Sequence, residues 1–258
     1  MKILRRLGWG LVLTVLSLAC GDRGPRQPSI TIATSANMQF AMEELTTRFT
    51  KQSGIACKLV LGSSGKLTAQ VRAGAPFDLF VAANMTYPEE LFRLGLATER
   101  PRIYATGELV LWTIKDHIPL SVKGLSGDSV VHIAIPNPRL APYGQAAMEA
   151  LQHYELDSLL QHKLVMGESI SQANQFIISG AADVGFTALS VVVAPGMEGK
   201  GRWKLVDKSL HHPIRQGVVL LRQDTPPSQQ AIKFYNFLFS PEAREVLKNF
   251  GYSEDEHP

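Results

Sequence analysis

The sequence predicts an α/β protein of two lobes, each built on a parallel sheet and joined to the other by two crossing strands. Three observations lead to this fold class. A short β-rich run, a turn of small residues and an amphipathic helix recur along the chain, which is typical of parallel sheets. Longer strand patterns at residues 108–113 and 217–221 interrupt this alternation. The 258 residues, 45% hydrophobic and 19% charged, suffice for one large or two modest domains.

The amino-terminal residues predict an export signal that lies outside the fold. Lys2, Arg5 and Arg6 precede an uncharged run at residues 7–20, which is too short to span a bilayer and typical of a secretory signal. Residues 1–19 are therefore predicted to be a signal peptide of an exported, periplasmic protein. Their removal takes away three basic residues, so the net charge falls from +3 to zero. No basic excess for nucleic acid remains.

The signal ends in a sequence that resembles a bacterial lipoprotein cleavage box, Leu-Ser-Leu-Ala-Cys. In this interpretation Cys20 is lipidated and anchors the protein to a membrane; the alternative is ordinary signal cleavage after Ala19. Residues 20–28 have no apolar period and are predicted to form a flexible tether. Cys57 then has no partner for an internal disulfide and is expected to act as a small buried apolar residue.

The first lobe is predicted to comprise residues 29–112 and 217–258. Its first helix shows an apolar stripe at helical spacing, and Gly54 is expected to end that helix. Its strands are predicted at residues 29–33, 58–61, 77–81 and 217–221. Its helices are predicted at residues 38–53, 66–73, 227–239 and 241–250, with a short one that starts near Pro88.

The second lobe is predicted to comprise residues 113–216 and to follow the same alternation. Its strands are predicted at residues 130–135, 162–166 and 184–187, and its helices at residues 145–154 and 171–180. Because ligands bind beyond the carboxyl ends of parallel strands, a site is expected where the turns of both lobes face each other. The unpaired N–H groups and the dipole of a helix N-terminus attract anions, so the expected ligand is an anion.

An enzyme is not indicated. The stretch VLGSSGKLT resembles a nucleotide-binding P-loop, but Val60 and Leu67 occupy two of the fixed positions of that motif. No G-x-S-x-G nucleophile motif is present, and the histidines lack the spacing of metal ligands. The chain is therefore predicted to bind a ligand without cofactor or catalysis. A sensory domain that does not take part in transport remains an alternative.

In the order and spacing of five segments, the chain resembles the molybdate- and tungstate-binding periplasmic proteins of bacterial ABC importers. The segments are ITIATSAN with AMEEL, LGSSGKLTAQVRAGAPFDLFVAAN, IPNPRLAPYGQAAMEAL, GESISQA and ADVGFTALS. The resemblance covers roughly residues 29–252 and implies a type II periplasmic-binding-protein fold. It also implies a monomer that captures the oxyanion between its lobes and delivers it to an ABC permease.

The resemblance further implies which residues contact the oxyanion. The ligand-binding positions it assigns are the N–H of Ala36, Asn37, Ser64, and the N–H groups of Tyr143 and Ile170. Asn37 and Ser64 have a second interpretation as helix caps. A pocket of donors without a carboxylate disfavours phosphate, which carries a proton near neutral pH, and leaves sulfate open as an alternative ligand.

Overall fold

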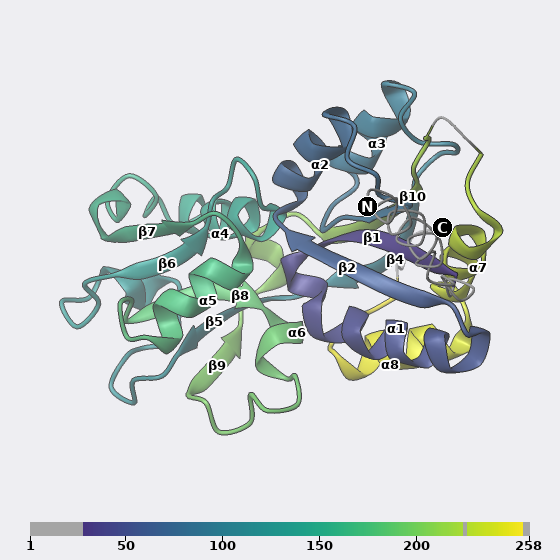
Figure 1. Cartoon of the computed structure of the whole chain (residues 1–258). Helices are drawn as coiled ribbons and strands as arrows, with labels where there is room; N and C mark the ends of the chain where they lie inside the picture. The colour runs from purple at the N-terminus through teal and green to yellow at the C-terminus, as the bar shows by residue number, and fades with distance from the viewer. Residues whose placement is uncertain (1–27, 224–225, 255–258) are drawn as a thin grey trace, which may run out of the picture.

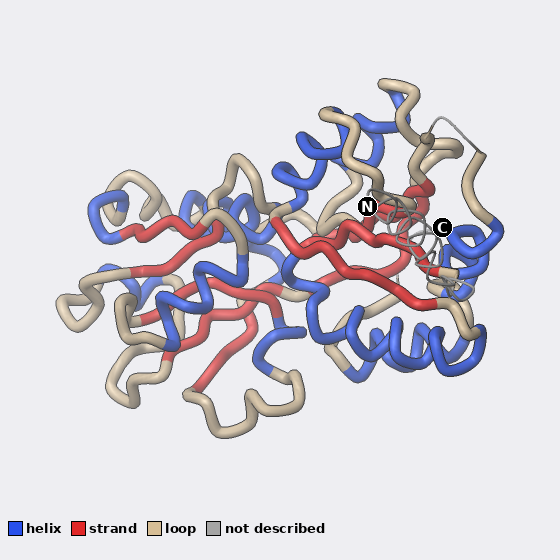
Figure 2. Tube along the Cα trace, in the orientation of Figure 1, coloured by secondary structure: helices blue, strands red, loops and turns tan. Residues whose placement is uncertain are grey.

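Figure 1 shows the computed structural model of the chain, which describes residues 28–223 and 226–254. The predictions for the signal peptide, for Cys20 and for nearly all of the tether lie outside the described residues. The described strands form two five-stranded sheets, and Figure 2 shows helices around both of them. Among these described helices, none has the length and apolar character that crossing a bilayer requires.

The first sheet has the strand order β2-β1-β3-β10-β4. Strands β1, β2 and β3 run parallel, and β10 pairs antiparallel with both β3 and β4. The parallel strands end at one edge of the sheet, where the chain turns into η1 and α2. The strands are β1 (Ser29–Ser35), β2 (Ala56–Gly62), β3 (Leu79–Val81), β4 (Arg102–Gly107) and β10 (Ile214–Leu220).

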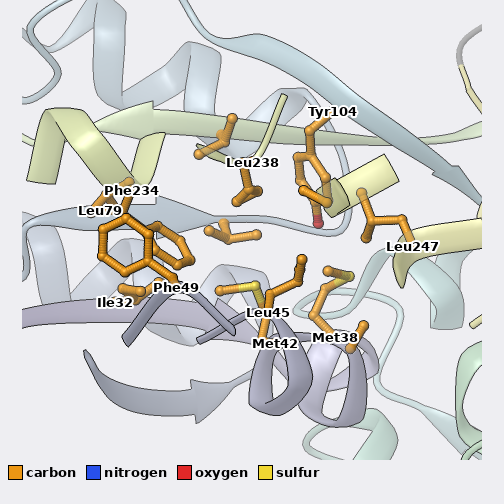
Figure 3. Close-up of a cluster of buried hydrophobic side chains, with 14 of the residues drawn as sticks. Ile32, Met38, Met42, Leu45, Phe49, Leu79, Tyr104, Phe234, Leu238 and Leu247 are labelled. Atoms are coloured by element: carbon orange, nitrogen blue, oxygen red, sulfur yellow. The ribbon is translucent and has the colours of Figure 1, made fainter. Parts of the chain in front are cut away.

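The helices of this lobe bury apolar faces against the sheet. The stripe of α1 packs its Phe49 edge-to-face on Phe234 of α7, with ring centroids 5.0 Å apart (Figure 3). Gly54 ends α1 with φ 70°, a conformation that suits glycine. The helices are η1 (Ala36–Met38), α1 (Gln39–Ser53), α2 (Ser64–Arg72), α3 (Thr86–Arg93), α7 (Gln229–Phe237) and α8 (Pro241–Asn249).

The second sheet has the order β7-β6-β8-β5-β9, with β6 parallel to β7 and β8. Its strands are β5 (Leu109–Thr113), β6 (Ile133–Pro136), β7 (Leu164–Gly167), β8 (Val184–Ala188) and β9 (Arg202–Leu205). Its helices are η2 (Lys123–Ser126), α4 (Pro142–Gln152), η3 (Gln161–Lys163), α5 (Ile170–Ile178), α6 (Leu189–Val192) and η4 (Lys208–Leu210). Strands β4 and β9 were not anticipated from the sequence.

The chain passes between the sheets at Glu108, which separates β4 from β5, and again just before Ile214. Strand β5 pairs antiparallel with β8 and β9, so it belongs to the second sheet, whereas all of β10 belongs to the first. We therefore propose that the lobe boundaries lie at Glu108 and near Pro213. They replace the boundaries predicted from the sequence, after residues 112 and 216. An apolar run predicts a strand but does not reveal its pairing partner.

Candidate functional site

The turns singled out in the sequence lie together where the two lobes meet. Ala36 of η1, Tyr143 of α4 and Ile170 of α5 are buried in one cluster with Ala83, which follows β3. Ser64, the first residue of α2, reaches this cluster because its Oγ accepts a 3.0 Å hydrogen bond from the Ala83 N–H. The structure thus brings together four helix N-termini, two from each lobe.

These helix N-termini present backbone N–H groups. A residue in the first turn of a helix has no acceptor within that helix, and the dipole gives this end a positive potential. Among the hydrogen bonds that connect the described turns and loops, none uses the N–H groups of Ala36, Asn37, Ser64, Tyr143 or Ile170. These N–H groups therefore have no acceptor among those hydrogen bonds, as an anion site at helix N-termini requires.

The serine pair before α2 supplies hydroxyl groups. Ser63, not Ser64, is the N-cap of α2, and it makes no capping hydrogen bond through its side chain. Its Oγ is buried and lacks a partner among the described residues. The capping interpretation of Ser64 is therefore wrong. Ser63 is an additional candidate that the sequence reasoning missed, although the doublet in GSSG was a signal for it.

The Asn37 side chain is held by other residues of the protein. Its Nδ2 donates to Gln216 Oε1 and to Tyr252 Oη, both at 2.9 Å, and its Oδ1 accepts a 2.7 Å hydrogen bond from Ser35 Oγ. Both amide protons are thus in use, so the side chain is neither a free donor nor a helix cap. What Asn37 can still offer an anion is its backbone N–H.

The side chains of Tyr143 and Ile170 are buried and have structural roles. The Tyr143 hydroxyl accepts a 3.1 Å hydrogen bond from Gln216 Nε2. Burial raises the pKa of Tyr143 well above its ordinary value, so the phenol stays neutral. The Ile170 side chain packs in the apolar cluster, and Ser169 caps α5 by accepting from the Gln172 N–H. The contribution expected of Tyr143 and Ile170 is therefore that of their backbone N–H groups.

Contacts between the lobes surround this region. The Gly65 N–H donates to Leu140 O at 2.8 Å, and the Tyr87 hydroxyl donates to Arg139 O at 3.1 Å. A third contact is the ion pair of Lys66 with Glu168, 2.7 Å between Nζ and Oε1, in which both side chains are about half exposed. Helices α2 and α3 of the first lobe are thereby joined to the turns before α4 and α5.

The buried hydrogen-bonding side chains of the region are uncharged. In the described part of the chain, the buried polar residues are all Ser, Thr, Asn or Gln. Two acids lie at the edge of the region, and both are paired: Glu168 with Lys66, and Glu108 with Lys208. No group of three or more His, Cys, Asp or Glu among the described residues is arranged to hold a metal ion. The arrangement suits an anion that accepts hydrogen bonds and donates none.

The fold and the sequence define the class of protein. Residues 30–253 match the family model of bacterial extracellular solute-binding proteins, and the chain belongs to this family. The predicted two-lobed periplasmic-binding-protein fold is confirmed, but both sheets are mixed and not parallel throughout as expected, because β10 and β5 pair antiparallel with their neighbours. Within the family, the chain is similar to molybdate-binding proteins, which confirms the resemblance found in its segments.

Two relatives are similar over nearly their whole length. The molybdate-binding protein ModA of Azotobacter vinelandii is 36% identical over 97% of this chain and 96% of its own. The ModA of Rhodobacter capsulatus is 37% identical over 93% of this chain and 94% of its own.

Solved structures of binding proteins are also similar to this chain. The periplasmic molybdate-binding protein of Azotobacter vinelandii superimposes with a TM-score of 0.83 at 34% identity, over 88% of this chain and 100% of that chain. The sulfate-binding protein SubI from Mycobacterium tuberculosis superimposes with a TM-score of 0.75 over 89% of this chain and 88% of that chain. Its identity is 15%, so it is evidence for the fold alone.

Proposed function

We propose that this protein captures molybdate or tungstate between its lobes and delivers the anion to an ABC permease. The observation that carries the proposal is the meeting of four helix N-termini from both lobes in a region where the buried polar groups of the described chain are uncharged. The names of the relatives support molybdate as the ligand. The protein acts as a binding protein and performs no reaction on the anion, so it needs no cofactor.

The contacts in this proposal come from both lobes. Ala36 and Asn37 contribute backbone N–H groups, and Ser64 contributes its hydroxyl and its N–H. Tyr143 and Ile170 contribute backbone N–H groups from the second lobe. Asn37 takes part through its backbone because its amide protons bond Gln216 and Tyr252. The buried Oγ of Ser63 is a further donor.

The chemistry of the donors favours an oxyanion that carries no proton. Phosphate near neutral pH retains a proton that needs an acceptor, whereas molybdate, tungstate and sulfate present only acceptors. Backbone dipoles and charge-assisted hydrogen bonds can stabilise such a dianion without lysine or arginine. Sulfate is the second candidate, because the same donors would suit it. A sensory role without transport is not favoured by the relatives.

The cellular setting is part of the proposal. We propose a periplasmic monomer, and the description of the family as extracellular solute-binding proteins supports a site of action outside the cytoplasm. Acylation of Cys20 would tie it to a membrane, and a permease would receive the anion from the closed protein. Metabolic labelling with a radioactive fatty acid tests the anchor: the expected label is lost in the Cys20→Ala variant. A wild-type protein without label would contradict it.

Calorimetric titration of the metal-free mature protein tests the ligand. We expect molybdate and tungstate to bind with one anion per protein, and phosphate at the same concentration to give no binding heat. Tighter binding of sulfate than of either oxometalate would replace the proposed ligand by the second candidate. Binding of phosphate alone would contradict the argument from neutral donors.

A further inference from the structure

A buried network of neutral side chains lies beside the candidate site and joins the two lobes. Five of its members belong to the first lobe and two to the second, and all of them are buried. The network contains three phenols, two amides and two hydroxyls and no ionised group. Its members are Ser35, Asn37, Tyr104, Gln216 and Tyr252 from the first lobe, and Tyr143 and Ser190 from the second.

Gln216 of β10 provides the first of two connections that the network makes between the lobes. Its Oε1 accepts from Asn37 Nδ2 at 2.9 Å and from the Tyr104 hydroxyl at 3.1 Å, while its Nε2 donates to Tyr143 Oη at 3.1 Å. These partners fix the orientation of the amide, because the oxygen faces two donors and the nitrogen faces an acceptor. One side chain thus contacts a site residue from each lobe.

The backbone around Gln216 leaves room for this arrangement. The pairing of β10 with β4 shifts register between Gln216 and Gly217. On β4, a Cβ added to Gly107 would lie 2.1 Å from Tyr143 Oη and 2.5 Å from Gln216 Nε2. A glycine at position 107 is therefore required for the hydrogen bond between these two side chains.

A second connection between the lobes is a ring of three hydrogen bonds. Asn37 Nδ2 donates to Tyr252 Oη at 2.9 Å, and the Tyr252 hydroxyl donates to Ser190 Oγ at 3.0 Å. Ser190 Oγ donates back to Asn37 O at 2.8 Å. Because Ser190 belongs to α6 of the second lobe, the ring holds η1 against that lobe.

We propose that Gln216 is a positioning residue that sets the distance between the anion donors of the two lobes and thereby selects the size of the anion. The inference rests on the proposed function. Asn37 and Tyr143 each offer a backbone N–H to the anion and a side chain to Gln216, so a change at Gln216 moves donors on both sides. Sulfate and the larger oxometalates carry the same charge, and donors held at one distance fit only one size well.

The first test replaces Gln216 by Met, which has a similar length but cannot make these hydrogen bonds. We expect the affinity for molybdate to fall by about tenfold or more, equivalent to about 1.4 kcal/mol. We also expect the ratio of molybdate to sulfate affinity to change, because the donor spacing is no longer fixed. The matched control is Val218→Ala, a buried residue of the same strand, which should lower the melting temperature and leave that ratio at its wild-type value.

The second variant, Gln216→Glu, keeps the shape of the side chain and makes its donor depend on pH. A protonated Glu can donate to Tyr143 as the amide does, whereas the ionised form cannot and adds a negative charge beside the anion. The titratable groups that contact position 216 are Tyr104 and Tyr143. Tyr252 lies near both of these phenols, and Glu108, which is paired with Lys208, lies near Tyr143. The three phenols stay neutral because burial raises the pKa of each of them. Because burial raises the pKa of a carboxyl, molybdate affinity of this variant should fall as the pH rises between about 6 and 9, while that of the wild type stays nearly constant.

The outcomes separate this inference from the proposed function. A lower melting temperature in Gln216→Met with an unchanged affinity ratio would show a purely structural role and overturn the inference. Wild-type protein that prefers sulfate would overturn molybdate as the ligand, while a shifted ratio in the variant would still support the role of Gln216. Wild-type protein that binds neither anion would overturn both.

Discussion

Ser64 provides the side-chain hydroxyl on which the proposed site depends most. Its Oγ is buried and already accepts from the Ala83 N–H, so its proton remains to be donated. Replacing Ser64 by Ala should weaken molybdate binding by about 1.5–3 kcal/mol, the range for a hydrogen bond to a charged group. Calorimetry measures the change. Thr46→Val is the control, because that buried hydroxyl bonds Met42 O within α1. An unaltered affinity in Ser64→Ala would remove Ser64 from the site.

Asp183 is a structural carboxylate of the second lobe. Its Oδ2 accepts 2.8 Å hydrogen bonds from the N–H groups of Val131 and His132, and Lys115 bonds Oδ1. Burial alone would raise the pKa of Asp183, but Lys115 and the two N–H groups outweigh it, and the pKa lies below its ordinary value. A lowered pKa stabilises the fold above the unfolded value of about 3.9, and this stabilisation is lost as the pH falls through the folded value.

Replacing Asp183 by Asn should therefore change how the free energy of unfolding depends on pH. The free energy of unfolding at neutral pH should fall, and the loss of stability between about pH 5 and 2 should become shallower than in the wild type. Urea unfolding at a series of pH values measures both effects. A variant with the same pH slope as the wild type would show that Asp183 does not contribute through its charge.

Helix α4 is positioned for the site by its contact with the end of β6. A Cβ added to Gly144 would lie 2.0 Å from Pro136 O, so only glycine lets the helix approach the strand this closely. Replacing Gly144 by Ala should push the N-terminus of α4 away, destabilise the fold by about 1–3 kcal/mol and weaken anion binding. Gly127→Ala is the control, because its nearest contact would be 3.3 Å. Wild-type affinity in Gly144→Ala would contradict the role assigned to the α4 N-terminus.

The elements that the sequence predicted well are those encoded locally. The apolar stripe of α1, the turn before α2 and the strand–turn–helix unit of β6 and α4 follow from periodicity and turn residues. Strand β9 alternates polar and apolar residues, but the alternation covers only Arg202–Leu205 and the strand is exposed along its whole length, which explains why it was missed. The Asn37 network was equally hidden, since Gln216 and Tyr252 lie 179 and 215 positions away in sequence.

Besides apolar packing, the two lobes contact each other through two kinds of polar interaction. At the edge near α2, the Lys66–Glu168 pair is half exposed, and such pairs contribute about 0–1 kcal/mol. Deeper between the lobes, Gln216, Tyr143 and Ser190 make buried hydrogen bonds that each contribute about 0.5–1.5 kcal/mol. An anion bound by N–H groups of both lobes adds contacts that exist only when the lobes are together. It therefore shifts the population toward the closed form.

Closure by the anion predicts a change in the dimensions of the molecule. Small-angle X-ray scattering should show a smaller radius of gyration in saturating molybdate than in its absence. At a ligand concentration about a hundred times the dissociation constant, the fold should also gain about 2.7 kcal/mol of stability, visible as a higher melting temperature. Ser64→Ala at the same molybdate concentration should show a smaller gain, because fewer molecules are occupied. A higher melting temperature without any change in the radius of gyration would mean that the anion binds lobes that are already closed, and would exclude closure as its effect.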